Sequence, residues 1–114
     1  MPKDFAELLP ELDQQPSDLV VTKRSWGAFA NTDLEARLHA LGVTQVVVVG
    51  VATASGVEAT ARQAYEGGFN VTLPLDAMTD ARPEAHAYCI AHVFPRLGET
   101  GRARDVLEKL EVRR

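Results

Sequence analysis

The amino-acid sequence predicts an α/β protein of three layers (α/β/α), in which a parallel, Rossmann-like sheet is covered by helices on both faces. The run Val46–Val49 has no polar face, which indicates a buried strand, and Phe69–Leu75 is typical of another strand. Between them, Ser55–Gly68 has the residue spacing of a helix. Strands that alternate with helices usually pair in parallel, because each helix carries the chain back across the sheet.

The first half of the chain contains one further strand and one further helix. After a helical turn or two within residues 1–15, we expect a strand at Asp18–Lys23, a loop at Arg24–Asn31 and a helix from Thr32. Thr32 and Glu35 form a capping box, in which a hydroxyl and a carboxylate satisfy free backbone N–H groups. Gly42 is expected to end this helix.

The second half continues the alternation. Another capping box, Ser55 with Glu58, predicts the start of the central helix. The remaining predicted elements are a helix from Glu84 to Phe94 that Pro95 ends, a connector or very short edge strand at Leu97–Glu99, and a last helix at Arg102–Leu110.

Composition limits the class of protein. The 114 residues give room for one domain, and 46% hydrophobic with 25% charged residues is typical of a folded, soluble one. A net charge of −4 argues against nucleic-acid or membrane-surface binding. No apolar run approaches the ~20 residues that a membrane helix needs, and the N-terminus does not resemble a secretory signal. With a single cysteine, Cys89, we expect a cytoplasmic protein without disulfides.

Three segments with polar groups follow the carboxyl ends of the predicted strands. Lys23 ends the first strand, the turn Val51–Ser55 follows the second, and Asp76 follows the third. The carboxyl ends of parallel strands share one edge of the sheet, where α/β proteins bind ligands. A helix that begins there also offers backbone N–H groups to an anionic or polarised atom. The sequence therefore predicts a small-molecule site at this edge, in which Asp76 is expected to have a structural role.

Several ordered motifs resemble the isochorismatase-like (cysteine hydrolase) family. They are VVTKRSWGAFANTDLEARL, then GVATASGVEATARQAYEGGFNVTLPLDAMTD, and finally FPRLGE. The likeness runs from about Val20 to Leu110, nearly the whole chain. It implies the family's three-layer fold and a hydrolase that acts on a small molecule without a cofactor.

The resemblance also gives roles to particular residues. Lys23 matches the family lysine, whose ammonium group would stabilise developing negative charge; otherwise it is a solvated lysine at a strand end. The backbone N–H groups of Ala52 and Gly56 match an oxyanion hole, with a cis peptide bond at Val51–Ala52; otherwise this is an ordinary strand-to-helix turn. Trp26 and Phe29 either line the pocket of a flat substrate or pack on the sheet.

Gly56 stands where most members of the family carry a nucleophilic cysteine. The covalent thiolate route is therefore closed, and Cys89 lies in a different predicted helix. The resemblance points instead to the isochorismatase-type branch, which hydrolyses a vinyl ether with an aspartate as general acid. This chain departs from that branch at Ala52, where its members carry an aromatic residue. His86, Cys89 and His92 have a spacing that metal ligands can share, but a partly buried helix face is favoured and we expect no zinc.

The family's aspartate ends an N-terminal strand that this chain lacks. We therefore expect a single domain, residues 1–114, that is truncated at its N-terminus relative to the family. The edge of the Val46–Val49 strand would then be bare, which favours a homo-oligomer. The first hypothesis is that the protein is a hydrolase, and that the chain of 114 residues alone is inactive or nearly so. The alternatives are a non-catalytic binding or oligomerisation module of the same fold, and a fragment that folds only with a partner supplying the absent strands.

Overall fold

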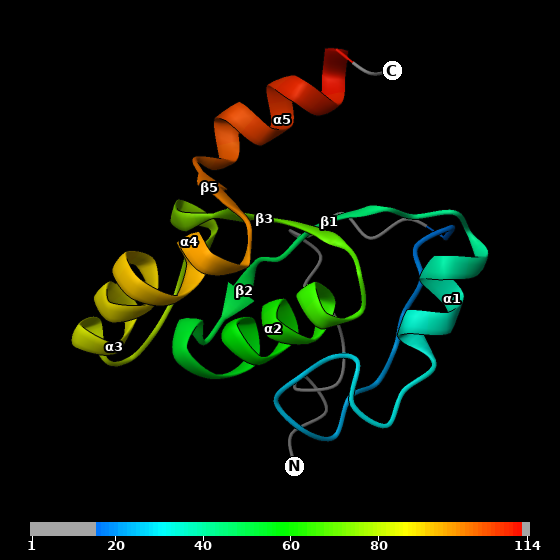
Figure 1. The fold of residues 1–114 in the computed structure, drawn as a ribbon, viewed down its shortest axis with the longest axis horizontal. Helices are drawn as coiled ribbons and strands as arrows, with labels where there is room; N and C mark the ends of the chain where they lie inside the picture. The colour runs from blue at the N-terminus through cyan, green and yellow to red at the C-terminus, as the bar shows by residue number, and fades with distance from the viewer. Residues whose placement is uncertain (1–15, 113–114) are drawn as a thin grey trace.

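A computed structural model describes residues 16–112 and contains two parallel sheets (Figure 1). The first has the strand order β1–β3–β5, formed by Gln45–Val47, Asn70–Pro74 and Glu99–Gly101. The second pairs β2 (Gly50–Val51) with β4 (Met78–Thr79). All strand pairs are parallel. The predicted α/β class with a parallel sheet is therefore confirmed, whereas the helical turn predicted within residues 1–15 lies outside the described residues.

Helices lie on both sides of the strands. In Figure 1, α2 lies below β1 and β3 with α3 and α4 beside it, whereas α5 projects away on the opposite side. Within the described residues the α-helices are α1 (Leu34–Ala40), α2 (Glu58–Glu66), α3 (Pro83–Tyr88), α4 (Phe94–Leu97) and α5 (Ala103–Val112). Asp76 anchors the start of α5, because its Oδ1 atom accepts a hydrogen bond from the Ala103 N–H at 2.7 Å. This contact agrees with the structural role expected for Asp76.

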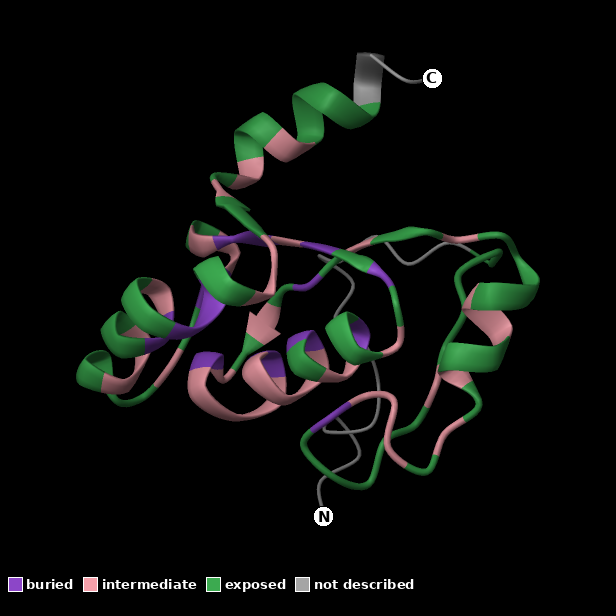
Figure 2. Cartoon of the chain, viewed as in Figure 1, coloured by how far each residue is buried: buried purple, intermediate pink, exposed green. Residues whose placement is uncertain are grey.

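The core lies between α2 and the strand β3. Ala61 and Ala64 on α2 are fully buried, and they belong to one apolar cluster with Leu73 of β3 and with Phe94. Figure 2 shows the buried residues on the face of α2 that is turned towards the strands. Small side chains on this face let the helix approach the sheet closely, so the turn that precedes α2 is held by a well-packed element.

Two predicted helix ends are confirmed by backbone geometry. Gly42 follows α1 with a φ of 76°, and Gly68 follows α2 with a φ of 89°. This left-handed conformation is easily adopted by glycine and rarely by other residues.

The strand predicted at Asp18–Lys23 is wrong. These residues form no strand, and within residues 16–112 no strand pairs with them. A strand needs a neighbour that accepts and donates its backbone hydrogen bonds, so a suitable sequence alone is not enough. Leu19 and Val20 are consequently exposed, by 45% and 58%.

The two predicted capping boxes are also wrong. The N-cap of α1 is Asp33 and not Thr32. The Thr32 hydroxyl nevertheless accepts the N–H of Leu34, the first residue of α1, at 3.4 Å, and it donates to the Ala28 carbonyl oxygen at 2.7 Å. The helical path to α2 begins before Ser55, in a π-helical turn over Thr53–Val57 (η3), without a side-chain cap from its own N-cap residue. The predicted hydroxyl thus contacts the start of α1 from one position earlier, whereas the helical path to α2 starts before its predicted box.

Pro95 does not end the helix that precedes it. After α3, a π-helical turn over Cys89–Val93 (η5) leads directly into α4, with Pro95 in the first turn of α4. Proline lacks an N–H group and clashes with the carbonyl four residues earlier in a regular α-helix. The wider π-turn accommodates the proline, so the chain remains helical to Leu97.

Candidate functional site

The turn after β2 changes the chain from strand to helix within a few residues. The peptide bond between Val51 and Ala52 is cis, which confirms the prediction. The Ala52 carbonyl oxygen accepts hydrogen bonds from the N–H groups of Ser55 at 3.2 Å and Val57 at 3.1 Å. Ala52 and Gly56 are thereby placed at the two ends of one tight turn, at the carboxyl end of β2.

Lys23 and Gly56 meet at this turn although they are far apart in the sequence. A Cβ atom built on Gly56 would lie 3.1 Å from Lys23 Nζ and 3.5 Å from the Trp26 carbonyl oxygen. Lys23 Nζ itself donates a hydrogen bond to that Trp26 oxygen at 2.8 Å. A side chain at position 56 would therefore point at an ammonium group.

The helix α2 holds the loop that carries Lys23. The Ala28 N–H donates to Thr60 Oγ1 at 3.0 Å, and the Phe29 N–H donates to Gln63 Oε1 at 3.1 Å. Thr60 and Gln63 are three residues apart on α2, so both project from the same face of the helix. The same helix thus positions both the turn that contains Gly56 and the loop beside it.

The two aromatic residues of this loop have different surroundings. Trp26 is 67% exposed, and its carbonyl oxygen rather than its ring contacts Lys23. The Phe29 ring stacks on Phe69 with 5.9 Å between centroids, which is the packing alternative stated for it. Phe29 also borders an apolar hollow of about 280 Å³ along Val46–Val49, so a ligand-binding role stays a prediction for both aromatics.

A larger hollow of about 800 Å³ lies elsewhere, between the sheet and α5. Its lining includes Tyr65, Thr72 and Val106 but neither Lys23 nor Gly56. The volume of a hollow therefore does not identify the candidate site. The site is identified by Lys23 and the backbone groups of the turn at Gly56, which lie close together.

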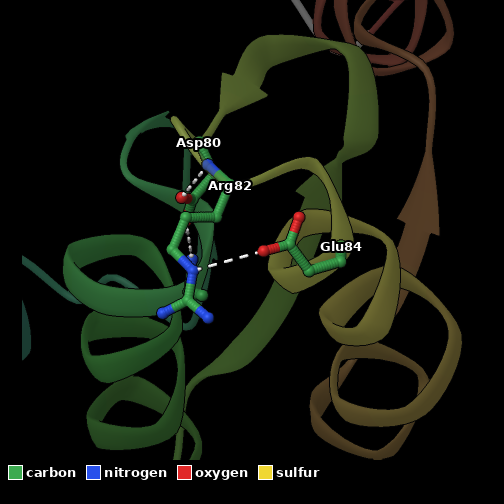
Figure 3. A network of polar contacts seen from close by, with 4 residues as sticks. Asp80, Arg82 and Glu84 are labelled. Atoms are coloured by element: carbon green, nitrogen blue, oxygen red, sulfur yellow. Dashed lines mark hydrogen bonds and ion pairs between the residues drawn. The ribbon is translucent and has the colours of Figure 1, made fainter.

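A second segment contacts the turn from the other side. Asp80, which directly follows β4, accepts a hydrogen bond from the Ala54 N–H on Oδ2 at 2.8 Å. Its Oδ1 accepts from the Arg82 N–H at 2.9 Å (Figure 3). These two N–H groups, Ala54 first, hold the pKa of the Asp80 carboxyl below its usual value, so the group is ionised at neutral pH. Farther along, His86 Nδ1 lies 2.7 Å from Thr53 Oγ1.

The sequence reasoning missed Thr53, Asp80 and His86 as members of the site. The sequence carries no local signal for them, because Asp80 follows the two-residue strand β4, which is recognised only through its parallel pairing with β2. A carboxylate at such a position can reach the free N–H groups of the neighbouring helix.

A family model for the isochorismatase domain matches residues 2–105. The chain belongs to the isochorismatase family. The resemblance stated from the motifs is thereby confirmed, and the fold is that of the isochorismatase-family hydrolases.

Similar proteins cover nearly all of this isochorismatase-family chain. The isochorismatase family protein YwoC of Bacillus subtilis is 40% identical over 111 residues, which are 97% of this chain and 59% of YwoC. An isochorismatase family protein from Burkholderia thailandensis has a TM-score of 0.82 and 44% identity over 85% of this chain and 51% of its own. An isochorismatase-like hydrolase from Alkaliphilus metalliredigens has a TM-score of 0.85 and 27% identity over 91% and 57%. The chain thus spans a little more than half the length of these relatives.

The cysteine of this isochorismatase-family chain lies in the core and not at the turn. Cys89 is buried, and its Sγ–H donates to Glu58 Oε1 at 3.1 Å. Burial, and then the hydrogen bond to Glu58, raise the pKa of the thiol to about 12. Because the thiolate is the reactive form, Cys89 is chemically inert at neutral pH.

The three residues with metal-like spacing have separate partners. His86 contacts Thr53, Cys89 contacts Glu58, and the His92 ring lies against Tyr88. Among the described residues, no cluster of three or more histidine, cysteine, aspartate or glutamate side chains is placed to hold a metal ion.

The helices within residues 16–112 are all too short or too polar to span a membrane.

Proposed function

We propose that this chain carries the lysine and the oxygen-binding turn of a hydrolase that acts on a small anionic or amide-like molecule without a cysteine nucleophile. The observation that carries the proposal is the 3.1 Å approach between Lys23 Nζ and the Cβ position of Gly56. Gly56, which the resemblance matches to the nucleophilic cysteine of most members, carries only hydrogen at its Cβ position, and an ammonium group faces that position.

In this mechanism a water molecule attacks the substrate directly. A vinyl ether is first protonated at its terminal carbon by the general acid, water then adds to the resulting oxocarbenium carbon, and the hemiketal loses the alcohol to leave a carbonyl compound. On an amide, water attacks the carbonyl carbon, and the products are a carboxylic acid and an amine. The N–H groups of Ala52 and Gly56 would hold the oxygen of an amide on which negative charge develops, or the carboxylate of an anionic vinyl ether, and Lys23 would stabilise that negative charge.

The general acid is proposed to come from outside residues 16–112, the part of the chain that the structure describes. Of the two carboxylates that follow strands near the turn, Asp80 is held ionised by the N–H groups of Ala54 and Arg82, and Asp76 accepts the Ala103 N–H. A carboxyl with a lowered pKa is a poor proton donor at neutral pH. The relatives' additional length is the proposed source of the acid, so this chain alone should bind substrate but hydrolyse it slowly or not at all.

The binding part of the proposal can be tested with 2-methoxyacrylate, a vinyl ether that bears a carboxylate and yields pyruvate on hydrolysis. In a titration followed by ¹H–¹⁵N NMR, the Ala52 and Gly56 amides should shift. Lys23→Ala should raise the Kd at least about tenfold, because the charge-assisted contact is lost. Arg24→Ala, which removes the adjacent exposed cation, should leave the Kd within about twofold.

Two results would contradict this proposal. Equal Kd values for Lys23→Ala and Arg24→Ala would show that Lys23 does not hold the ligand. Rapid release of pyruvate by the chain alone, abolished in Lys23→Ala, would show that the acid is not missing.

We also propose that copies of the chain associate through the segment that contains β1 and β2, because within residues 16–112 β1 pairs only with β3 and β2 only with β4. Val47, Val49 and Val51 of this segment are 43%, 53% and 72% exposed, and an apolar strand without a second neighbour is a template for pairing. Sedimentation velocity over an about hundredfold concentration range should show concentration-dependent association. Val49→Lys should weaken it, whereas Leu107→Lys, on the exposed face of α5, should not. A wild-type chain that stays monomeric throughout would contradict the proposed association.

A further inference from the structure

We propose that Asp80 and His86 are positioning residues that hold the turn Val51–Val57 in the conformation needed for ligand binding. The inference rests on the proposed function, because the groups that they position are the amides of Ala52 and Gly56. Neither side chain is assigned a contact with the ligand.

The first contact is made by Asp80 immediately after the strand pair β2–β4 ends. Thr79 is opposite Val51 in that pair, so the next residue, Asp80, is carried alongside the start of the turn. Oδ2 accepts the Ala54 N–H at 2.8 Å while Oδ1 accepts the Arg82 N–H at 2.9 Å. In Figure 3 the Asp80 side chain points back towards Arg82 of its own segment. Because both carboxylate oxygens are engaged, the carboxylate is fixed in orientation and fixes the Ala54 N–H in turn.

The second contact is made by His86 of α3. Thr53 is fully buried, and its hydroxyl oxygen lies 2.7 Å from His86 Nδ1. A buried hydroxyl that loses its partner destabilises the conformation that buries it. Among the described residues, no buried side-chain nitrogen or oxygen lacks a hydrogen-bond partner, so the His86 contact belongs to a fully satisfied core.

Together these contacts act on the middle of the turn. Thr53 and Ala54 lie between Ala52 and Gly56, and one segment, from Asp80 to His86, holds both of them. The helix that follows is held independently, because Ala61 and Ala64 are packed in the core. Loss of either side chain should therefore loosen the turn without loosening α2.

Amide hydrogen exchange distinguishes this positioning role from a general contribution to stability. In Asp80→Ala and His86→Ala, the amides of Ala54 and Ser55, which donate to Asp80 and to the Ala52 carbonyl oxygen, should exchange about tenfold faster relative to the amide of Ala64 than in the wild type. His86→Asn should restore most of the protection, because an asparagine side chain can bond the Thr53 hydroxyl in place of Nδ1. Glu84→Gln is the matched control, since Glu84 is exposed and pairs with Arg82 at 3.4 Å. An equal change at the turn and at Ala64, or no change at either, would overturn the proposal.

A second measurement with the same variants links the turn to the ligand. Asp80→Ala and His86→Ala should raise the Kd for 2-methoxyacrylate about tenfold, and His86→Asn should recover most of the affinity. Faster exchange at the turn with an unchanged Kd would overturn the positioning role. If the wild type does not bind the probe at all, the proposed function fails, and the exchange measurement alone decides whether Asp80 and His86 hold the turn.

Discussion

Gly98→Ala should destabilise the chain by about 3 kcal/mol, because an added methyl group would overlap the backbone of the adjacent strand. A Cβ atom at this position would collide with the Val71 carbonyl oxygen and lie 2.8 Å from the Val71 carbonyl carbon. The φ of Gly98 is 179°, which any residue adopts, so the effect comes from crowding and not from backbone strain. Since β3 is the central strand of its sheet, relief of the clash would displace β5 from it.

Thermal unfolding followed by circular dichroism measures this effect, and Gly101→Ala is its matched control. A Cβ atom on Gly101 would lie in open space, with no heavy atom within 4 Å beyond its two chain neighbours. We expect Gly98→Ala to lower the Tm by about 10–20 °C and Gly101→Ala to change stability by less than about 0.5 kcal/mol. If Gly98→Ala does not accumulate as folded protein while Gly101→Ala does, the same conclusion follows. Equal melting temperatures would contradict the close approach of Gly98 to β3.

Gly56→Cys should create a thiol that is alkylated about tenfold faster at pH 7 than an unperturbed cysteine. The new Cβ atom would lie 3.1 Å from Lys23 Nζ, the mobile end of a long side chain, so a small shift of the lysine makes room. The ammonium group would then stabilise the thiolate and lower the thiol pKa. The position at the start of a helix acts in the same direction.

The native cysteine provides an internal comparison for that experiment. Cys89 is buried and its thiol pKa is raised to about 12, so it should stay unmodified in the folded chain. One thiol should therefore react rapidly with iodoacetamide in Gly56→Cys, and none in the wild type. Rapid modification of the wild type would contradict the burial of Cys89 beside Glu58.

The parts of the fold that were predictable are those specified by local sequence. The helix that ends at Gly68 and the strand before Leu75 each carry their own signal. The β-branched run at Val46–Val49 does signal a strand, but β1 covers Gln45–Val47 and the expected burial is wrong, since Val47 and Val49 are exposed and only Val48 of the run is buried. The strand expected at Asp18–Lys23 does not form because pairing depends on a neighbour and not on the segment itself. The helix predicted to stop at Pro95 continues because a π-turn absorbs the proline, and residue preferences do not reveal such a turn.

The candidate site likewise has one part that local sequence predicts and one part that depends on the folded arrangement. The turn at Ala52–Gly56 was predictable, because it follows a recognisable strand and carries a recognisable motif. Asp80 and His86 contact residues 26 and 33 positions earlier in the chain, and only the folded arrangement brings them together. The sequence also suggested Ser55 as the cap of the helix, whereas Asp80 supplies the carboxylate from another segment.

The central claim is that Lys23 and the turn at Gly56 form one electrostatic unit. The most direct test compares the rate of alkylation by iodoacetamide of Gly56→Cys in a Cys89→Ser background, with and without Lys23→Ala, as a function of pH. We expect Lys23→Ala to raise the pKa of the new thiol and to slow its alkylation at pH 7 about tenfold, whereas Arg24→Ala changes the rate by less than about twofold. Identical pH profiles with and without Lys23 would contradict the claim, because the ammonium group would then have no effect on a thiol at position 56.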